Sequence, residues 1–90
     1  MSDQLMDFSS RVGQESWRLM AQRALDELSE NSDFDRFTAL LGAALIPVAE
    51  VLREPIEKAR DSRNMADQMV AICSRQLLGL LEPVIGKEEG

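Results

Sequence analysis

The 90-residue sequence contains no histidine and no tyrosine, and it has only one cysteine. The lack of histidine removes the commonest general base and metal ligand, and it leaves Cys73 without the usual activating partner. A single cysteine also excludes an internal disulfide, which favours a reducing compartment. Because Cys73 stands among apolar residues, we expect it to behave as a small buried hydrophobic side chain.

Other elements of familiar catalytic sites are also missing. The sequence has no glycine-rich phosphate loop and no zinc-binding spacing of cysteines. Its close carboxylate pairs, such as Asp33 with Asp35 and Glu54 with Glu57, fall in expected helix caps and surface turns. None stands in the apolar setting that acid catalysis requires. We therefore expect no enzyme, no cofactor and no metal site.

Long hydrophobic runs are absent as well. The longest stretch without a charge is the thirteen-residue run from Phe37 to Ala49, and it contains Pro47. A membrane-spanning helix needs about 20 apolar residues. The first residues also lack the basic and apolar regions of a signal peptide. These observations predict a cytoplasmic protein that does not enter a membrane.

Positive charge is scarce relative to negative charge. Sixteen acidic and ten basic residues give a net charge of −6. The basic residues are scattered, and several alternate with Glu or Asp between Arg53 and Arg63. Binding to phosphate backbones depends on clustered Lys and Arg, so the composition argues against direct contact with nucleic acid.

The sequence does contain strong helical periodicity. Apolar residues, 44% of the chain, recur at spacings of three and four throughout. The central run is apolar nearly all round, which predicts a helix with neighbours on more than one side. Its main stripe comprises Leu40, Leu41, Ala44, Leu45 and Val48, and Ala39, Ala43 and Ile46 lie on the opposite side.

Glycine and proline mark the points where these helices are interrupted. The apolar stripe of the N-terminal helix changes face just after Gly13, so the helix either breaks there or runs through and contacts two surfaces. We favour the break. Pro47 lies inside the central pattern, but the apolar register continues across it, which indicates a kink and not an end. Ser32 is the expected cap of the central helix, and Asn64 or Ser62 that of the last one.

The expected fold is therefore an all-α bundle of three principal helices, or four if the N-terminal helix is broken near Gly13, with the central helix kinked at Pro47. We expect one helical domain over residues 1–90, with a frayed acidic tail at 87–90.

The apolar residues exceed what one stripe per helix can hide, and exposed apolar area usually marks an interface. Small residues at Ala39 and Ala43 allow close approach of a second copy, and Ile46 lies on the same side. The competing account is that the N-terminal helix covers this side within one chain. The candidate partner-binding residues are Trp17, Ala39, Ala43, Ile46, Met65, Met69 and Leu78.

These features predict a small protein-interaction module, such as an accessory, adaptor or chaperone-like subunit, that acts by helix–helix binding as a homodimer. The identity of its protein partner cannot be read from the residues. The alternative is an acidic inhibitor or regulator of a nucleic-acid enzyme, of the type encoded by phages and mobile elements.

Overall fold

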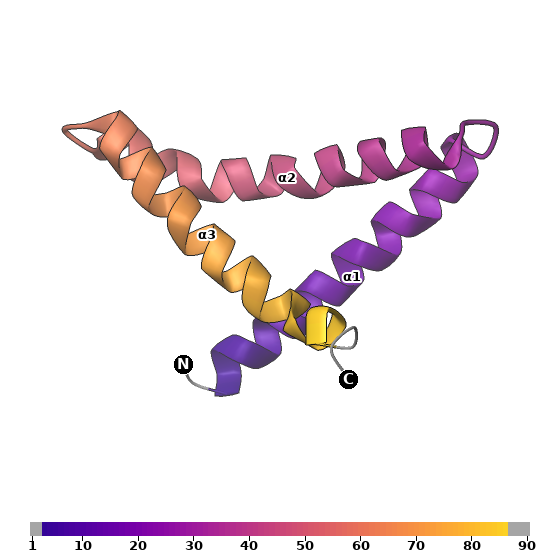
Figure 1. Cartoon of the computed structure of the whole chain (residues 1–90), viewed down its shortest axis with the longest axis horizontal. Helices are drawn as coiled ribbons and strands as arrows, with labels where there is room; N and C mark the ends of the chain where they lie inside the picture. The colour runs from indigo at the N-terminus through magenta and orange to yellow at the C-terminus, as the bar shows by residue number, and fades with distance from the viewer. Residues whose placement is uncertain (1–2, 87–90) are drawn as a thin grey trace. The chain divides into compact units, whose positions relative to one another are not determined.

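The computed structural model describes residues 3–86 of the chain, and this part is almost entirely helical (Figure 1). It contains three α-helices, α1 (Asp3–Glu27), α2 (Asp33–Lys58) and α3 (Ser62–Ile85), and the described residues include no β-strand. The prediction of an all-α fold with three principal helices is confirmed. The tail predicted at 87–90 lies outside the described residues.

The N-terminal helix is not broken at Gly13, so the predicted break is wrong. Helix α1 is continuous over Asp3–Glu27, and no described glycine has a positive φ. A glycine inside a helix costs about 1 kcal/mol relative to alanine, which is too little to end a helix with strong helix formers on both sides. The change of apolar face after Gly13 therefore reflects one helix with two different apolar faces.

Helix α2 continues through both of its prolines. It runs over Asp33–Lys58 and so includes Pro47 and Pro55. A proline removes one backbone hydrogen bond but need not end a helix whose apolar register is maintained. The prediction that Pro47 does not stop the helix is confirmed, while the kink itself stays a prediction.

Contacts divide the chain into two compact units, one extending to Pro47 and the other beginning at Val48. The first unit is a helical hairpin of α1 and the N-terminal half of α2, and the second is a hairpin of the C-terminal half of α2 and α3. The prediction of a single domain over residues 1–90 stays a prediction.

The first hairpin is held by one narrow stripe from each helix. Ala24 is 8% exposed and is the one buried residue of the described chain. Around it, the half-buried residues are Met20 and Ala21 of α1, Leu28 directly after α1, and Arg36, Leu40 and Ala44 of α2. Both sets follow helical spacing, so each helix turns one face towards the other. The small Ala24 side chain allows the two backbones to approach.

The second hairpin is built in the same way. Its half-buried residues are Leu52, Pro55, Ile56 and Ala59 around the end of α2, and Met65, Ala66, Met69 and Cys73 in the first half of α3. Cys73 is thus half-buried and not fully buried as expected. Beyond Cys73 the side chains of α3 are exposed.

Arg36 stabilises the loop that joins α1 to α2 by hydrogen bonds. Its guanidinium donates hydrogen bonds to the carbonyl oxygens of Leu28 at 3.3 Å and Ser29 at 3.4 Å, and also to that of Asn31. It additionally pairs with the carboxylate of Asp33. Carbonyl groups at the end of a helix have no partner within the helix, and an arginine is well suited to bind several of them.

Polar caps begin the two later helices. The Ser32 hydroxyl accepts a hydrogen bond from the Asp35 amide at 3.1 Å, which confirms Ser32 as a cap. The cap of α3 is Asp61, whose side chain accepts from the Asn64 amide at 3.0 Å. The predicted caps Asn64 and Ser62 are wrong by one to three residues, because Asp61 offers an equally good acceptor earlier in the chain.

We predict that Gly13→Ala stabilises the protein by about 1 kcal/mol, because the glycine is helical and a methyl group there meets nothing within 4 Å. Denaturant unfolding followed by far-ultraviolet circular dichroism measures the change. A loss of stability would indicate that the chain needs glycine at this position, as a broken helix would.

Arg36→Ala is expected to lower the free energy of unfolding by about 1–2 kcal/mol, because three carbonyl groups lose a charged donor. The matched control is Arg53→Ala. Arg53 pairs only with the exposed carboxylates of Glu50 and Glu57 within the described chain, so its removal should change stability by less than about 0.5 kcal/mol. Equal effects of the two substitutions in a urea titration would show that the Arg36 hydrogen bonds contribute nothing.

Candidate interaction surface

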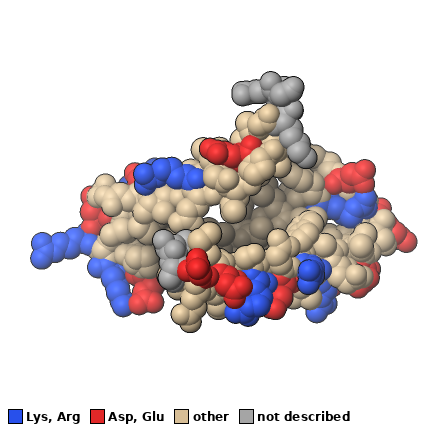
Figure 2. Space-filling view, turned by 90° about the horizontal axis from the view of Figure 1, so that it is seen from below, with Lys and Arg blue, Asp and Glu red and all other residues tan. Residues whose placement is uncertain are grey.

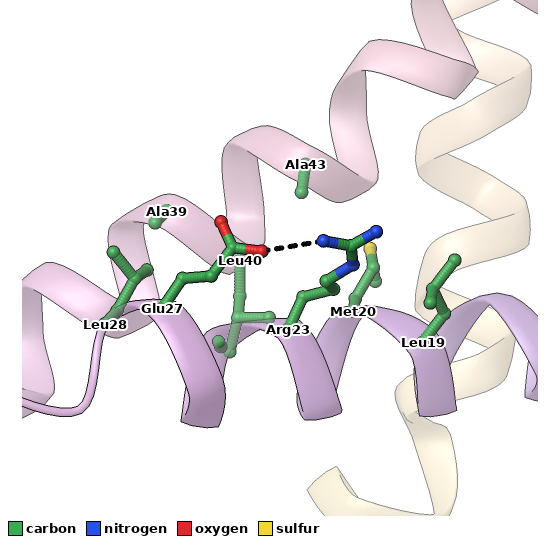
Figure 3. A pocket seen from close by; sticks show the side chains of 9 residues that line it. Leu19, Met20, Arg23, Glu27, Leu28, Ala39, Leu40 and Ala43 are labelled. Atoms are coloured by element: carbon green, nitrogen blue, oxygen red, sulfur yellow. Dashed lines mark hydrogen bonds and ion pairs between the residues drawn. The ribbon is translucent and has the colours of Figure 1, made fainter.

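A shallow apolar groove lies between α1 and α2 within the first hairpin (Figure 3). Its volume is about 290 Å³, and its lining residues are Leu19, Met20, Arg23, Ala24, Glu27, Leu28, Ala39, Leu40 and Ala43. Met20 of α1 and Leu28, directly after α1, point towards α2, and Leu40 points from α2 towards α1. The groove exists because the alanines on both helices leave room that larger side chains would fill.

An ion pair is the only charged feature of this groove. Arg23 donates to the Glu27 carboxylate at 2.9 Å, and Figure 3 shows the pair lying across the front of the groove. The two residues are one turn apart on α1 and are both largely exposed, so the pair contributes little to stability. The aliphatic parts of the Arg23 and Glu27 side chains extend the apolar wall of the groove. The groove therefore suits an apolar side chain better than a polar small molecule.

Two of the predicted partner-binding residues, Ala39 and Ala43, line this groove together. Helix α1 of the same chain therefore lies beside them. This agrees with the alternative that the N-terminal helix covers this side of α2 within one chain. Both alanines nevertheless remain exposed. Ile46 is outside the groove lining and is 67% exposed, and Trp17 is about half exposed on α1.

The remaining predicted residues belong to the second hairpin. Met65 and Met69 are half-buried on the side of α3 that also carries Cys73, whereas Leu78 is exposed. The two methionines thus contribute to the packing of their own hairpin, and Leu78 is available at the surface. Whether any of these residues binds a partner stays a prediction.

Three residues of the main stripe predicted on α2, Leu41, Leu45 and Val48, are exposed in the structure, where they belong to a second apolar stripe that also includes two phenylalanines. It consists of Phe34, Phe37, Leu41, Leu45 and Val48, which are between 40% and 73% exposed. Neighbouring Leu40 and Ala44 take the half-buried positions beside α1 instead. The periodicity of the sequence identified the apolar residues of α2 correctly. It did not show which of two neighbouring apolar stripes is covered by α1.

Charged side chains of both signs are interspersed on the face shown in Figure 2. Ion pairs at helical spacing join Asp7 to Arg11 at 3.8 Å, Glu54 to Lys58 at 2.6 Å and Asp67 to Arg63 at 3.3 Å. No buried polar side-chain atom lacks a partner in the described part of the chain. The charges therefore form a solvated, self-paired surface around the apolar stripes.

Neither a metal site nor a membrane span is found in residues 3–86. That part of the chain has no group of three or more acidic or cysteine side chains placed to hold an ion. None of its three helices combines the length and the apolarity that a bilayer crossing requires.

Comparison with known proteins gives no further assignment, since no family model, curated protein or solved structure matches the chain.

We predict that Ala24→Leu lowers the free energy of unfolding by about 1–3 kcal/mol, because a larger side chain at the buried contact forces α1 and α2 apart. Ala39→Leu is the matched control. It adds the same atoms at an exposed position of the groove and should change stability by less than about 0.5 kcal/mol. Thermal unfolding of both variants tests the packing, and a neutral Ala24→Leu would contradict the close approach of the helices there.

Proposed function

We propose that this chain is a small protein-interaction module, an accessory, adaptor or chaperone-like subunit that acts by helix–helix binding and works as a homodimer. The observation that carries the proposal is the contrast in burial within each hairpin. One face of each helix is partly covered, while large apolar side chains stay exposed on other faces of the same helices. Apolar surface of this extent is typical of binding sites.

The exposed residues form ordered stripes and are not scattered. On α1, Leu5, Phe8 and Leu19 are exposed on one side, and the half-buried stripe beside α2 lies on another. On α2, Phe34, Phe37, Leu41 and Leu45 form a second exposed stripe. Stripes at helical spacing match the way in which amphipathic helices recognise one another.

The distribution of charge favours an apolar partner over a basic one. Most acidic side chains described on α2 stand one helical turn from a basic residue, as Glu54 does from Lys58 and Glu57 from Arg53. Asp7, Glu27 and Asp67 on the other two helices are likewise paired with a basic residue one turn away, which argues against an inhibitor that imitates nucleic acid. The proposed partner surface is therefore apolar.

The cytoplasm is the compartment that fits this proposal. A lone half-buried thiol at Cys73 is compatible with reducing conditions. The partner beyond a second copy of the chain is a protein with an apolar helical surface.

The proposal predicts a mass near twice 10.1 kDa in sedimentation equilibrium at micromolar concentration. Because apolar contacts are not weakened by salt, and because screening reduces repulsion between two chains of net charge −6, the dimer should be at least as stable at about 1 M salt as at about 0.1 M. A mass of 10.1 kDa at every concentration would refute the homodimer.

A further inference from the structure

The middle of α2 is packed into neither hairpin. The half-buried residues that α2 contributes to the first hairpin end at Ala44, and those that it contributes to the second begin at Leu52. All seven residues between them, 45–51, are exposed. Seven residues make nearly two turns, so they point to every side of the helix. This segment is held by the backbone hydrogen bonds of α2 and not by packing within either hairpin.

Pro47 weakens the helix inside this segment. It has no amide hydrogen, so the carbonyl oxygen of Ala43 lacks the donor that a helix normally supplies four residues later. A residue before a proline also disfavours the α region, and here that residue is Ile46. Ile46, Val48 and Val51 are β-branched, which lowers their helix propensity further. The segment therefore combines a weak local preference for helix with a lack of packing.

Pro55 has the same chemistry in a different setting. It also lies inside α2, but it is half-buried in the second hairpin, as are Leu52 and Ile56 on either side of it. Packing of this kind supplies most of the stability of a helix in a protein, so a missing hydrogen bond there is tolerated. The boundary between the two compact units of the chain falls directly after Pro47 and not at Pro55.

We infer that residues 43–51 of α2 form a hinge at which the helix bends reversibly, so that the two hairpins reorient while each keeps its own packing. A hinge is a short stretch that absorbs a change in backbone dihedral angles while the bodies on either side stay intact. The inference is independent of the homodimer. Its consequence is that the exposed apolar side chains of the two hairpins are presented to a partner in more than one arrangement.

Amide hydrogen exchange, measured residue by residue by NMR, tests the hinge. The amides of residues 48–51 should exchange at least about tenfold faster, after correction for intrinsic rates, than those of residues 40–44 and 56–58. Pro47→Ala restores the missing hydrogen bond and should slow exchange at 48–51 by about fivefold or more. Pro55→Ala is the matched control, and it should leave these rates within about twofold of the wild type.

A distance measurement distinguishes a hinge from a fixed kink. Spin labels at Thr38→Cys and Glu57→Cys, in a Cys73→Ser background, occupy exposed positions of α2 and enclose both prolines. In a straight helix the labelled positions are about 29 Å apart. The wild type should give a broad distance distribution, which narrows in Pro47→Ala and is unchanged in Pro55→Ala. Dilution with unlabelled chains removes distances between two copies.

Several outcomes would overturn the inference. A narrow wild-type distribution would show a rigid helix, either straight or with a fixed kink. Equal exchange rates along α2 would show that the segment does not open, and a Pro55→Ala variant that matches Pro47→Ala would show that packing makes no difference. Exchange at Ala24 and Met69 as fast as that at residues 48–51 would show that the hairpins unfold together with the segment.

Discussion

A hairpin of two helices can cover only one side of each helix, and the rest of this structure follows from that constraint. In the first hairpin the covered side is centred on Ala24, which is small enough for α1 and α2 to approach. In the second it is centred on the residues around Ile56 and Met69. Each hairpin by itself therefore leaves the other apolar stripes of its helices uncovered. The excess of exposed apolar side chains is thus a product of the architecture and not of a few misplaced residues.

The helices could be predicted from the sequence because they depend on local signals. Ser32 caps α2 as expected, and the two loops fall where polar and turn-forming residues cluster. The break at Gly13 was predicted wrongly because the change of apolar face was interpreted as the end of a helix. In the structure the face changes while the helix continues, so that one part of α1 serves the hairpin and the other does not.

The candidate surface was harder to predict because it depends on which of two adjacent stripes is covered. Leu40 and Leu41 are neighbours in sequence and have the same hydrophobicity, but one faces α1 and the other is exposed. Only the position of α1 decides between them, and α1 is positioned by the close contact at Ala24 and by the Arg36 hydrogen bonds at the loop. No local pattern in α2 contains that information. Similarly, the pairing of Met65 and Met69 with their own hairpin depends on where α3 turns back at Asp61.

The hydrogen bonds of Arg36 span only five to eight residues, and the contacts of each hairpin likewise join neighbouring helices across a short loop. Such a structure has a low contact order, and helical proteins of this kind fold in microseconds to milliseconds. Neither hairpin has to wait for the closure of a long loop. In the proposed homodimer, the concentration-dependent step is therefore the meeting of two chains, which follows the folding of each hairpin.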